Sequence, residues 1–438
     1  MLIWAENVWD RCSAGAWLPN PQRDFTMPPI VKIPHVVVDG CERFAEVFPN
    51  QPQRRHLAEY LTGLVVSKNK TVSGISAEFV ETTDQSCLNR FLTSADWDVD
   101  ELNVRRLELL QEDPTTQYCD RGVIALDDVL IDHYGKLIED VGWFWDHAEQ
   151  RSKIAHDYLF ANYVCPNGKH YPLEFRRFKK RDQCEATGEE FQDHGVLFRE
   201  LVAWVCEREI PGDFTFDSYF SSAENLNFIH TQKNQRDESR AYVGDLKTNR
   251  KLEVRGKSIR ADEFAASIAR EDRKELRRGD DRQWYYTTTV RLPQVKHPVR
   301  IVMIWRNRRD PKLAKVLVTN RTRWEVNRIL KTYRYRWTGT ETFHRDGKQE
   351  LGMGACQLRS GQGQTRHMHL VMLAYTLLMR ELKSSRAKEW TLERLMTIGQ
   401  ACRAVANETL GATLRWAITE ITNNSRQTKH VIAQLGLI

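Results

Sequence analysis

The sequence predicts an α/β protein in which a mixed sheet is flanked by helices, with a helical domain before it and a helical segment after it. Three observations support this class. From Arg121 onward, the predicted order is strand, strand, strand, helix, strand, helix. Between Arg43 and about Leu110, apolar residues recur three or four positions apart, as on the buried face of helices. A further helical pattern occupies residues 385–438.

The start of the chain is predicted to be an irregular arm followed by a small helical domain. Residues 1–38 contain proline-rich stretches such as MPPIVKIP, which favour extended backbone. In the domain, residues 39–115, TVSGISAEF and CLNRFL look like two helices joined by a short turn, with Thr83 or Asp84 as the cap of the second. Such a pair is compatible with a DNA-binding helix-turn-helix and equally with plain helix packing. The basic residues on its expected binding side are Arg54, Arg55, Lys68, Lys70 and Arg90.

The mixed sheet is predicted within residues 116–384. GVIALDDVLI, HDYLFANYVC, HYPLEFRRF and FTFDSYF are rich in aromatic or β-branched residues and have the length of strands, and two of them carry acids near their ends. LFRELVAWVCEREI, before the last of them, has a helical pattern. At about residues 236–310, charged connections such as REDRKELRRGDDR join alternating strands such as WYYTTTVRL. We interpret this region as a β-rich insertion.

The overall charge is only weakly informative. The chain has 65 basic and 59 acidic residues, a net charge of +6, and this excess is too small to indicate nucleic-acid binding. The distribution is more informative, because only Asp310 and Glu325 interrupt a basic stripe between Trp305 and Arg336. The stripe consists of Arg306, Arg308, Arg309, Lys312, Lys315, Arg321, Arg323, Arg328, Lys331, Arg334 and Arg336. It suits a phosphate backbone, although a solvated charged surface has the same composition.

Cysteine usage and the first residues indicate the compartment. The nine cysteines stand singly without paired spacing, and MLIWAENVWDRC lacks the basic start of a secretory signal. We therefore expect a reducing cytoplasm. No stretch is apolar over the length needed to span a bilayer, so no membrane role is expected.

One carboxylate, Glu341, lies among basic residues at helical spacing. The residues three, four and seven positions after it share one face of a helix. They are His344, Arg345 and Lys348. A carboxylate in so basic a setting suits a metal ion that faces an anionic substrate such as a phosphodiester. The alternative is an ordinary solvated helix with ion pairs.

Three acidic sites in this order give the chain a resemblance to the DDE transposases of bacterial insertion sequences. ALDDVLIDHYGKLIEDVGWFWDHA, with Asp127, is similar to the family's first acidic strand, and FTFDSYFSS, with Asp217, to the second. Glu341 takes the third place. The resemblance covers roughly residues 43–384.

The subgroup it resembles has a signature around the third acid. The pattern is Tyr, two residues, Arg, three residues, Glu, six residues, Lys, and here Tyr333, Arg336, Glu341 and Lys348 take these places. Four residues rather than three separate the Arg from the Glu, so one extra residue near Gly339 must be accommodated.

The resemblance implies a ribonuclease H-like mixed sheet with the β-rich insertion between the second and third acids. It implies that Asp127, Asp217 and Glu341 are catalytic and bind two Mg²⁺ ions about 3.5–4 Å apart, with Mn²⁺ as an expected substitute. Asp128 is the alternative to Asp127, because adjacent strand residues point to opposite faces. Relatives often carry Thr two residues after the first acid, where this chain has Val129.

The resemblance also assigns DNA contacts. Tyr333, Arg336 and Lys348 would contact terminal phosphates, with His344 and Arg345 on the same basic face. Trp284 and Trp305, in the predicted insertion, are candidates for stacking on a base flipped out near the cut. Ordinary core packing is the alternative for both rings.

The activity implied is cut-and-paste transposition. The protein would bind the terminal inverted repeats of an insertion sequence, cleave the DNA and join the 3′ ends to target DNA, as a homodimer on DNA in the bacterial cytoplasm, associated with the nucleoid. Residues 385–438 could help to pair the subunits. Two alternatives share these sequence features: a catalytically inactive DNA-binding relative, and a metal-dependent nuclease without strand transfer.

Overall fold

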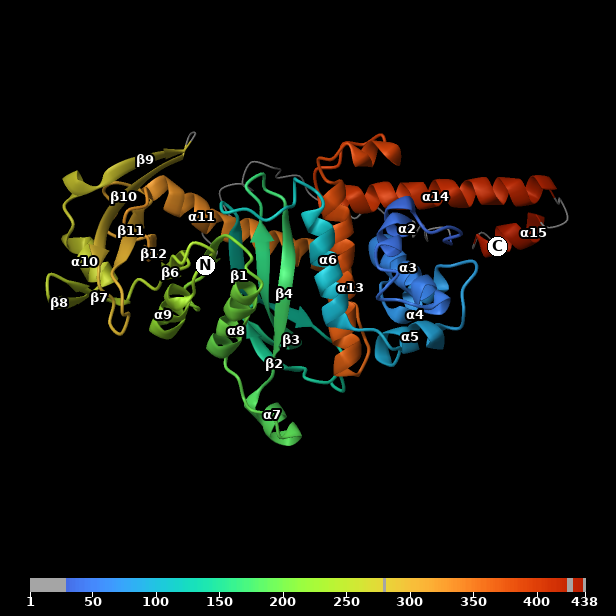
Figure 1. The fold of residues 1–438 in the computed structure, drawn as a ribbon, viewed down its shortest axis with the longest axis horizontal. Helices are drawn as coiled ribbons and strands as arrows, with labels where there is room; N and C mark the ends of the chain where they lie inside the picture. Colours follow the sequence, from blue (N-terminus) through green and yellow to red (C-terminus); the bar gives the residue numbers. More distant parts are fainter. Residues whose placement is uncertain (1–28, 279–280, 424–427, 436–438) are drawn as a thin grey trace.

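The computed structural model describes residues 29–278, 281–423 and 428–435 (Figure 1). The chain begins with helices α2 (His35–Glu42), α3 (Gln51–Val66), α4 (Val72–Ala77), α5 (Gln85–Thr93) and α6 (Val99–Gln111). The Asp84 side chain accepts a hydrogen bond from the backbone N–H of Ser86, which confirms Asp84 as the cap of α5. Helix starts at His35, earlier than the predicted end of the arm at residue 38, and residues 1–28 of that arm lie outside the described residues.

Five strands form the core of the sheet, with β3 antiparallel to β1 and β4, and with β5 parallel to both β1 and β6. They are β1 (Val123–Asp132), β3 (Arg151–Val164), β4 (His170–Phe178), β5 (Asp213–Phe216) and β6 (Tyr242–Leu246). The resulting order β4-β3-β1-β5-β6 is that of a ribonuclease H-like core, and confirms the predicted mixed sheet. The parallel pairs need helical crossovers. These are α8 (His194–Glu207) and α9 (Ala223–Thr231), while β2 (Gly142–Asp146) extends the edge of β3 and α7 (Arg181–Thr187) follows β4.

The β-rich insertion continues the same sheet. Its elements are β7 (Lys251–Val254), β8 (Lys257–Arg260), α10 (Ala261–Ser267), β9 (Lys274–Arg278), β10 (Asp281–Val290), β11 (Val299–Trp305) and β12 (Lys315–Thr319). β12 pairs antiparallel with β6, and β11, β10 and β9 follow in order. The predicted bounds of about 236–310 take in β6, which pairs parallel with β5, and end before β12.

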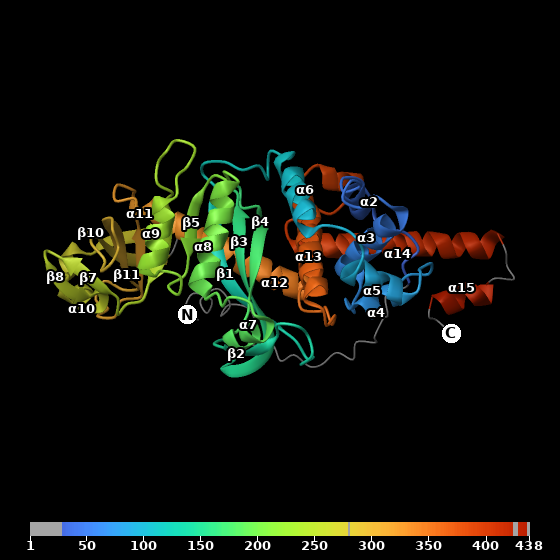
Figure 2. The ribbon, with the colours of Figure 1, turned by 60° about the horizontal axis from the view of Figure 1, so that its bottom comes forward.

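The last helices return across the sheet and then run to the other end of the molecule. They are α11 (Val326–Gly339), α12 (Glu341–Glu350), α13 (Gly361–Glu381), α14 (Ile398–Asn423) and α15 (Thr428–Gln434). Figure 2 shows α13 and α6 between the sheet and the first helices. α13 is buried along nearly its whole length and contacts α3, α5, α6, α14 and β4. The two terminal helical regions and one face of the sheet therefore share a continuous apolar core.

A buried arginine ties these parts together. Arg106 on α6 donates to the carbonyl oxygens of Pro172 (2.8 Å) and Leu173 (2.9 Å) on β4 and to the Thr376 hydroxyl (3.1 Å) on α13. Burial lowers the pKa of Arg106 to about 10, so the side chain stays charged at neutral pH. Its donors satisfy carbonyl groups that no water can reach.

We predict that Arg106→Met lowers the free energy of unfolding by about 3 kcal/mol, because it leaves several buried acceptors without donors. Urea denaturation followed by circular dichroism measures this loss. Arg105→Ala is the matched control, since Arg105 pairs only with the exposed acids Glu46 and Glu108. It should change stability by no more than about 0.5 kcal/mol. Equal losses in the two variants would contradict the assignment.

Candidate active site

Three acids from separate elements meet on one face of the sheet. Asp127 lies on β1, Asp217 directly follows β5, and Glu341 is the first residue of α12. Leu126 pairs with Phe216 in the parallel register, which places Asp217 beside Asp127. Burial raises the pKa of Asp127 well above its ordinary value, and the negative charges of Asp217 and Glu341 add to the rise. The structure therefore brings the three predicted acids within electrostatic reach of one another.

The strand alternation of β1 separates Asp127 from Asp128. Asp127 faces α11 and α12, where its carboxylate meets Arg336 and Thr340. Asp128 points to the opposite face, toward Asp157 and His194. The geometry thus groups Asp127, rather than Asp128, with the third acid.

The Asp127 carboxylate is held by Arg336. The guanidinium forms an ion pair with Oδ2 of Asp127, and the Thr340 hydroxyl donates to the same oxygen over 3.3 Å. Both ion-pair partners are largely buried, with side chains 13% and 12% exposed. Burial opposes the charge of Arg336, but Asp127 and the neighbouring acids outweigh it and raise the pKa of the guanidinium. Arg336 therefore offsets the charge of the acid cluster.

The extra residue between Arg336 and Glu341 falls at a break between two helices. α11 ends at Gly339, and α12 begins at Glu341 after Thr340, whose ψ of −64° turns the chain. A Cβ on Gly339 would lie 2.7 Å from Cγ2 of Val164 and 2.9 Å from Cβ of Ala125. Glycine therefore lets the end of α11 touch the sheet, and this contact sets where Glu341 begins the next helix.

We predict that Gly339→Ala weakens metal binding by about tenfold, because the added methyl group pushes the α11–α12 junction and Glu341 away from β1. Titration with Mn²⁺ followed by calorimetry measures the change. Gly256→Ala is no suitable control, since its φ of +77° is itself strained. Gly135→Ala is suitable, because its Cβ would meet only Ile138 at 3.3 Å. Unchanged Mn²⁺ affinity in Gly339→Ala would contradict this role of the close contact.

Sequence reasoning missed a fourth acid at this edge of the sheet. Asp245 on β6 accepts hydrogen bonds from the Tyr333 hydroxyl (3.3 Å) and pairs with Lys315 on β12 (3.2 Å). Lys315 also donates to the Tyr333 hydroxyl over 3.1 Å. Burial raises the pKa of Asp245, Lys315 opposes the rise, and Asp217 adds to it. The sequence feature that could have indicated Asp245 is the segment YVGDL, which carries an acid as the segments around Asp127 and Asp217 do.

Among the predicted phosphate contacts, His344 is a correction. Its side chain is buried and packs against Phe160 and Phe343. Burial, with Lys348 and Arg336 nearby, lowers the pKa of His344 to about 3, so the ring is neutral. A neutral, buried imidazole does not suit a phosphate. Arg345 and Lys348 are exposed, and Arg345 pairs with its neighbour Asp346.

Several of the basic residues predicted to contact DNA from the first helices instead make contacts within the protein. Arg54 donates to the carbonyl oxygens of residues 45, 48 and 49, and Lys70 donates to the carbonyl oxygen of Leu64. Arg55 pairs with Glu59 on its own helix, and Arg90 contacts the Cys87 sulfur. Lys68 is exposed. These contacts match the packing alternative for Arg54 and Lys70.

The tryptophans separate into buried and accessible rings. Trp305 is 0% exposed, with the Arg273 guanidinium 4.1 Å from its ring centre, so it is a core residue and not an accessible stacking surface. Trp284, opposite it on β10, is half-buried. Trp337 was missed: it follows Arg336 on α11 and is 51% exposed.

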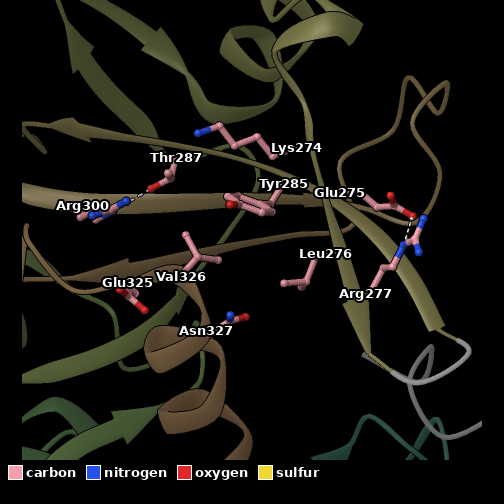
Figure 3. Close-up of a pocket in the computed structure, with 10 residues that line it drawn as sticks. All are labelled: Lys274, Glu275, Leu276, Arg277, Tyr285, Thr287, Arg300, Glu325, Val326 and Asn327. Atoms are coloured by element: carbon pink, nitrogen blue, oxygen red, sulfur yellow. Dashed lines mark hydrogen bonds and ion pairs between the residues drawn. The ribbon is translucent and has the colours of Figure 1, made fainter.

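A hollow of about 400 Å³ lies on the same sheet face, where β9, β10 and β11 meet the start of α11 (Figure 3). Lys274, Tyr285, Thr287 and Arg300 line it from the strands, and Asn327 from the helix. Arg300 is fixed by hydrogen bonds to the Thr287 hydroxyl and the Thr322 carbonyl. The acids Glu275 and Glu325 also border the hollow, so its charge is mixed.

The acid cluster has the donor chemistry of a divalent-cation site, although it is not arranged around an ion. Carboxylate oxygens are the ligands preferred by Mg²⁺ and Mn²⁺. Across the described ranges, no three His, Cys, Asp or Glu side chains are positioned to hold a metal ion together. The Arg336 guanidinium lies on Asp127 and supplies positive charge there. Asp127, Asp217 and Glu341 thus offer the kind of ligand that such an ion takes, and in this structure Asp127 is occupied by its ion pair with Arg336.

Two family models match the chain. A family described as DDE superfamily endonuclease matches residues 43–190, and a family described as transposase DDE domain matches residues 200–377. No curated protein matches the chain. A solved structure of the piggyBac transposase synaptic complex with hairpin DNA is similar at 11% identity and a TM-score of 0.49, covering 88% of this chain and 76% of that one. Among the described helices, none has the length and apolar character to cross a membrane.

Proposed function

Since the chain belongs to the DDE transposases, which cleave DNA and transfer its strands, we propose that it binds the terminal inverted repeats of an insertion sequence and moves that element by cut-and-paste transposition. The observation that supports this proposal is the placement of Asp217 beside Asp127 in the parallel register, with Glu341 close enough for its charge to act on Asp127. Transfer of the 3′ ends to target DNA completes the proposed reaction.

In this proposal Asp127, Asp217 and Glu341 hold divalent cations, Mg²⁺ in the cell. When bound, a pair of such ions activates a water or a 3′ hydroxyl and stabilises the leaving oxygen of an in-line displacement. The carboxylates orient that pair because they come from rigid elements of the sheet and from a helix start. Asp128 is not proposed as a ligand, since it faces the other side of β1.

Arg336 has two successive partners in the proposed reaction. Without DNA it pairs with Asp127, as in the structure. A terminal phosphate offers a second anionic partner, and the Tyr333 ring lies 5.7 Å from the Arg336 guanidinium. Lys348, exposed two turns after Glu341 on α12, is proposed as a further phosphate contact. We propose that DNA draws Arg336 from Asp127 to the phosphate and thereby frees the carboxylate for a metal ion.

The rest of the DNA is proposed to follow the sheet face toward the insertion. Lys274 and Arg300 at the hollow shown in Figure 3, and the basic stripe that ends at Arg336, would contact its backbone. Trp284 and the exposed Trp337 are the proposed surfaces for an unpaired base near the cut.

A homodimer is proposed for the DNA complex, because two ends must be brought together. The outer part of α14 supports this, since Leu414 and Ile418 stand one turn apart and are exposed. Pairing of these stripes from two copies would bury both.

We predict that Asp217→Asn lowers metal-dependent cleavage at least about 100-fold, because it removes a carboxylate ligand. The substrate is DNA that carries the short inverted repeats flanking the gene. DNA affinity, measured by fluorescence anisotropy, should stay within about threefold, since the fold and basic surfaces remain.

Asp120→Asn is the matched control for Asp217→Asn, because Asp120 is exposed and pairs with the exposed Arg236. It should cleave as the wild type does. Full cleavage by Asp217→Asn would refute the proposed site. Cut ends that never join target DNA would instead indicate a nuclease without strand transfer.

We further predict that DNA ends and Mn²⁺ bind with positive coupling of about tenfold, about 1.4 kcal/mol, because the phosphate removes Arg336 from Asp127. In Arg336→Gln, Mn²⁺ should bind more tightly without DNA, and the coupling should disappear. Calorimetric Mn²⁺ titrations with and without end DNA measure both effects.

Arg334→Gln serves as the control for this coupling, because Arg334 lies on the same helix but is exposed and donates to the carbonyl oxygen of Leu330 on that helix. It should retain the wild-type coupling. If DNA changes Mn²⁺ affinity equally in wild type and Arg336→Gln, Arg336 does not connect the two ligands.

A further inference from the structure

A second polar cluster lies behind β1, on the face opposite the three proposed metal ligands. It consists of Asp128 on β1, Asp157 on β3 and His194, the first residue of α8. His194 Nε2 lies 2.8 Å from Oδ2 of Asp157, and both side chains are mostly buried. The other carboxylate oxygen of Asp157 is buried without a hydrogen-bond partner. A buried carboxylate with a free oxygen needs a nearby positive charge.

His194 is rigidly placed. Its ring stacks on Phe178 with 4.1 Å between ring centres, and α8 starts at this residue because the Asp193 side chain accepts from the Val196 N–H. Burial alone would lower the pKa of His194, but the hydrogen bond to Asp157 and the charges of Asp157 and Asp128 outweigh it and raise that pKa. The acids around His194 therefore favour its protonated form.

The cluster is connected to the catalytic face through Tyr219. The Tyr219 ring packs edge-on against His194, with 5.6 Å between ring centres. The backbone N–H of Tyr219 donates to Oδ1 of Asp217 over 2.8 Å. The turn that carries Asp217 therefore rests against the His194 ring.

We propose that His194 is a positioning residue for the metal site: it braces the Asp217 turn through Tyr219 and offsets the charge of Asp157 behind β1. This inference rests on the proposed function only in taking Asp217 as a metal ligand. His194 itself contacts neither DNA nor metal in this role.

The test measures Mn²⁺ binding directly, by calorimetry on the full chain without DNA. His194→Gln keeps a hydrogen-bond donor near Asp157 but removes the charge, and should weaken Mn²⁺ binding about tenfold with end-DNA affinity unchanged. Adding Asp157→Asn removes the charge that His194 offsets, so the double variant should recover to within about threefold of wild type. His147→Gln is the control, because His147 is exposed in the turn after β2.

The proposal would be overturned if His194→Gln bound Mn²⁺ as tightly as the wild type. It would also be overturned if adding Asp157→Asn did not raise the Mn²⁺ affinity above that of His194→Gln alone. If His194→Gln does not fold, Asp157→Asn is compared with the double variant. Without the Asp157 charge they should bind Mn²⁺ within threefold of each other, and a larger gap overturns the proposal. Mn²⁺ binding that Asp217→Asn fails to weaken would refute the metal site instead, which is a separate result.

Discussion

The structure depends on balancing the negative charge of Asp127 in the middle of β1, Asp217 just after β5 and Asp245 on β6. Two like charges 4 Å apart repel by about 4 kcal/mol at the effective dielectric near a protein surface. Cations on different elements oppose this repulsion: Arg336 at Asp127, Lys315 at Asp245 and His194 at Asp157. Arg336 and His194 come from helices beside the sheet, and Lys315 comes from β12 within it, so the packing that holds these elements also places the cations beside the acids.

That constraint explains why the acid cluster is held between two rigid bodies. On one side, the insertion extends the core sheet through the β6–β12 pair. On the other, α13 joins both terminal helical regions to β4, with Arg106 satisfying the carbonyl groups at that junction. Loss of either support would allow the strands that carry Asp127 and Asp217 to shift, and carboxylates that bind metal must hold their geometry to a fraction of an ångström.

The sequence predicted a mixed sheet flanked by helices because strand and helix patterns are local signals. Strand composition and the Asp84 cap each occupy a few consecutive residues, whereas Asp127, expected near the end of its strand, lies in the middle of β1. The errors concern tertiary burial. His344 and Trp305 stand in basic or strand patterns that suggested exposure, yet both are covered by elements distant in sequence. Asp245 was missed because its strand was assigned to the insertion, and only its pairing with β5 shows that it lies beside Asp217.

Helix α11 gives the insertion a physical connection to the acids. Its 14 residues span about 21 Å. Its first turn borders the hollow formed with β9–β11, its middle carries Tyr333 and Arg336, and its end, at Gly339, rests on β1 and β3 next to Glu341. The helix packs on the sheet through Val326 and Ile329, so its two ends cannot move independently. The insertion therefore does more than add surface to the protein. A ligand bound in the hollow would contact α11, the helix that carries Arg336 and that ends next to Glu341.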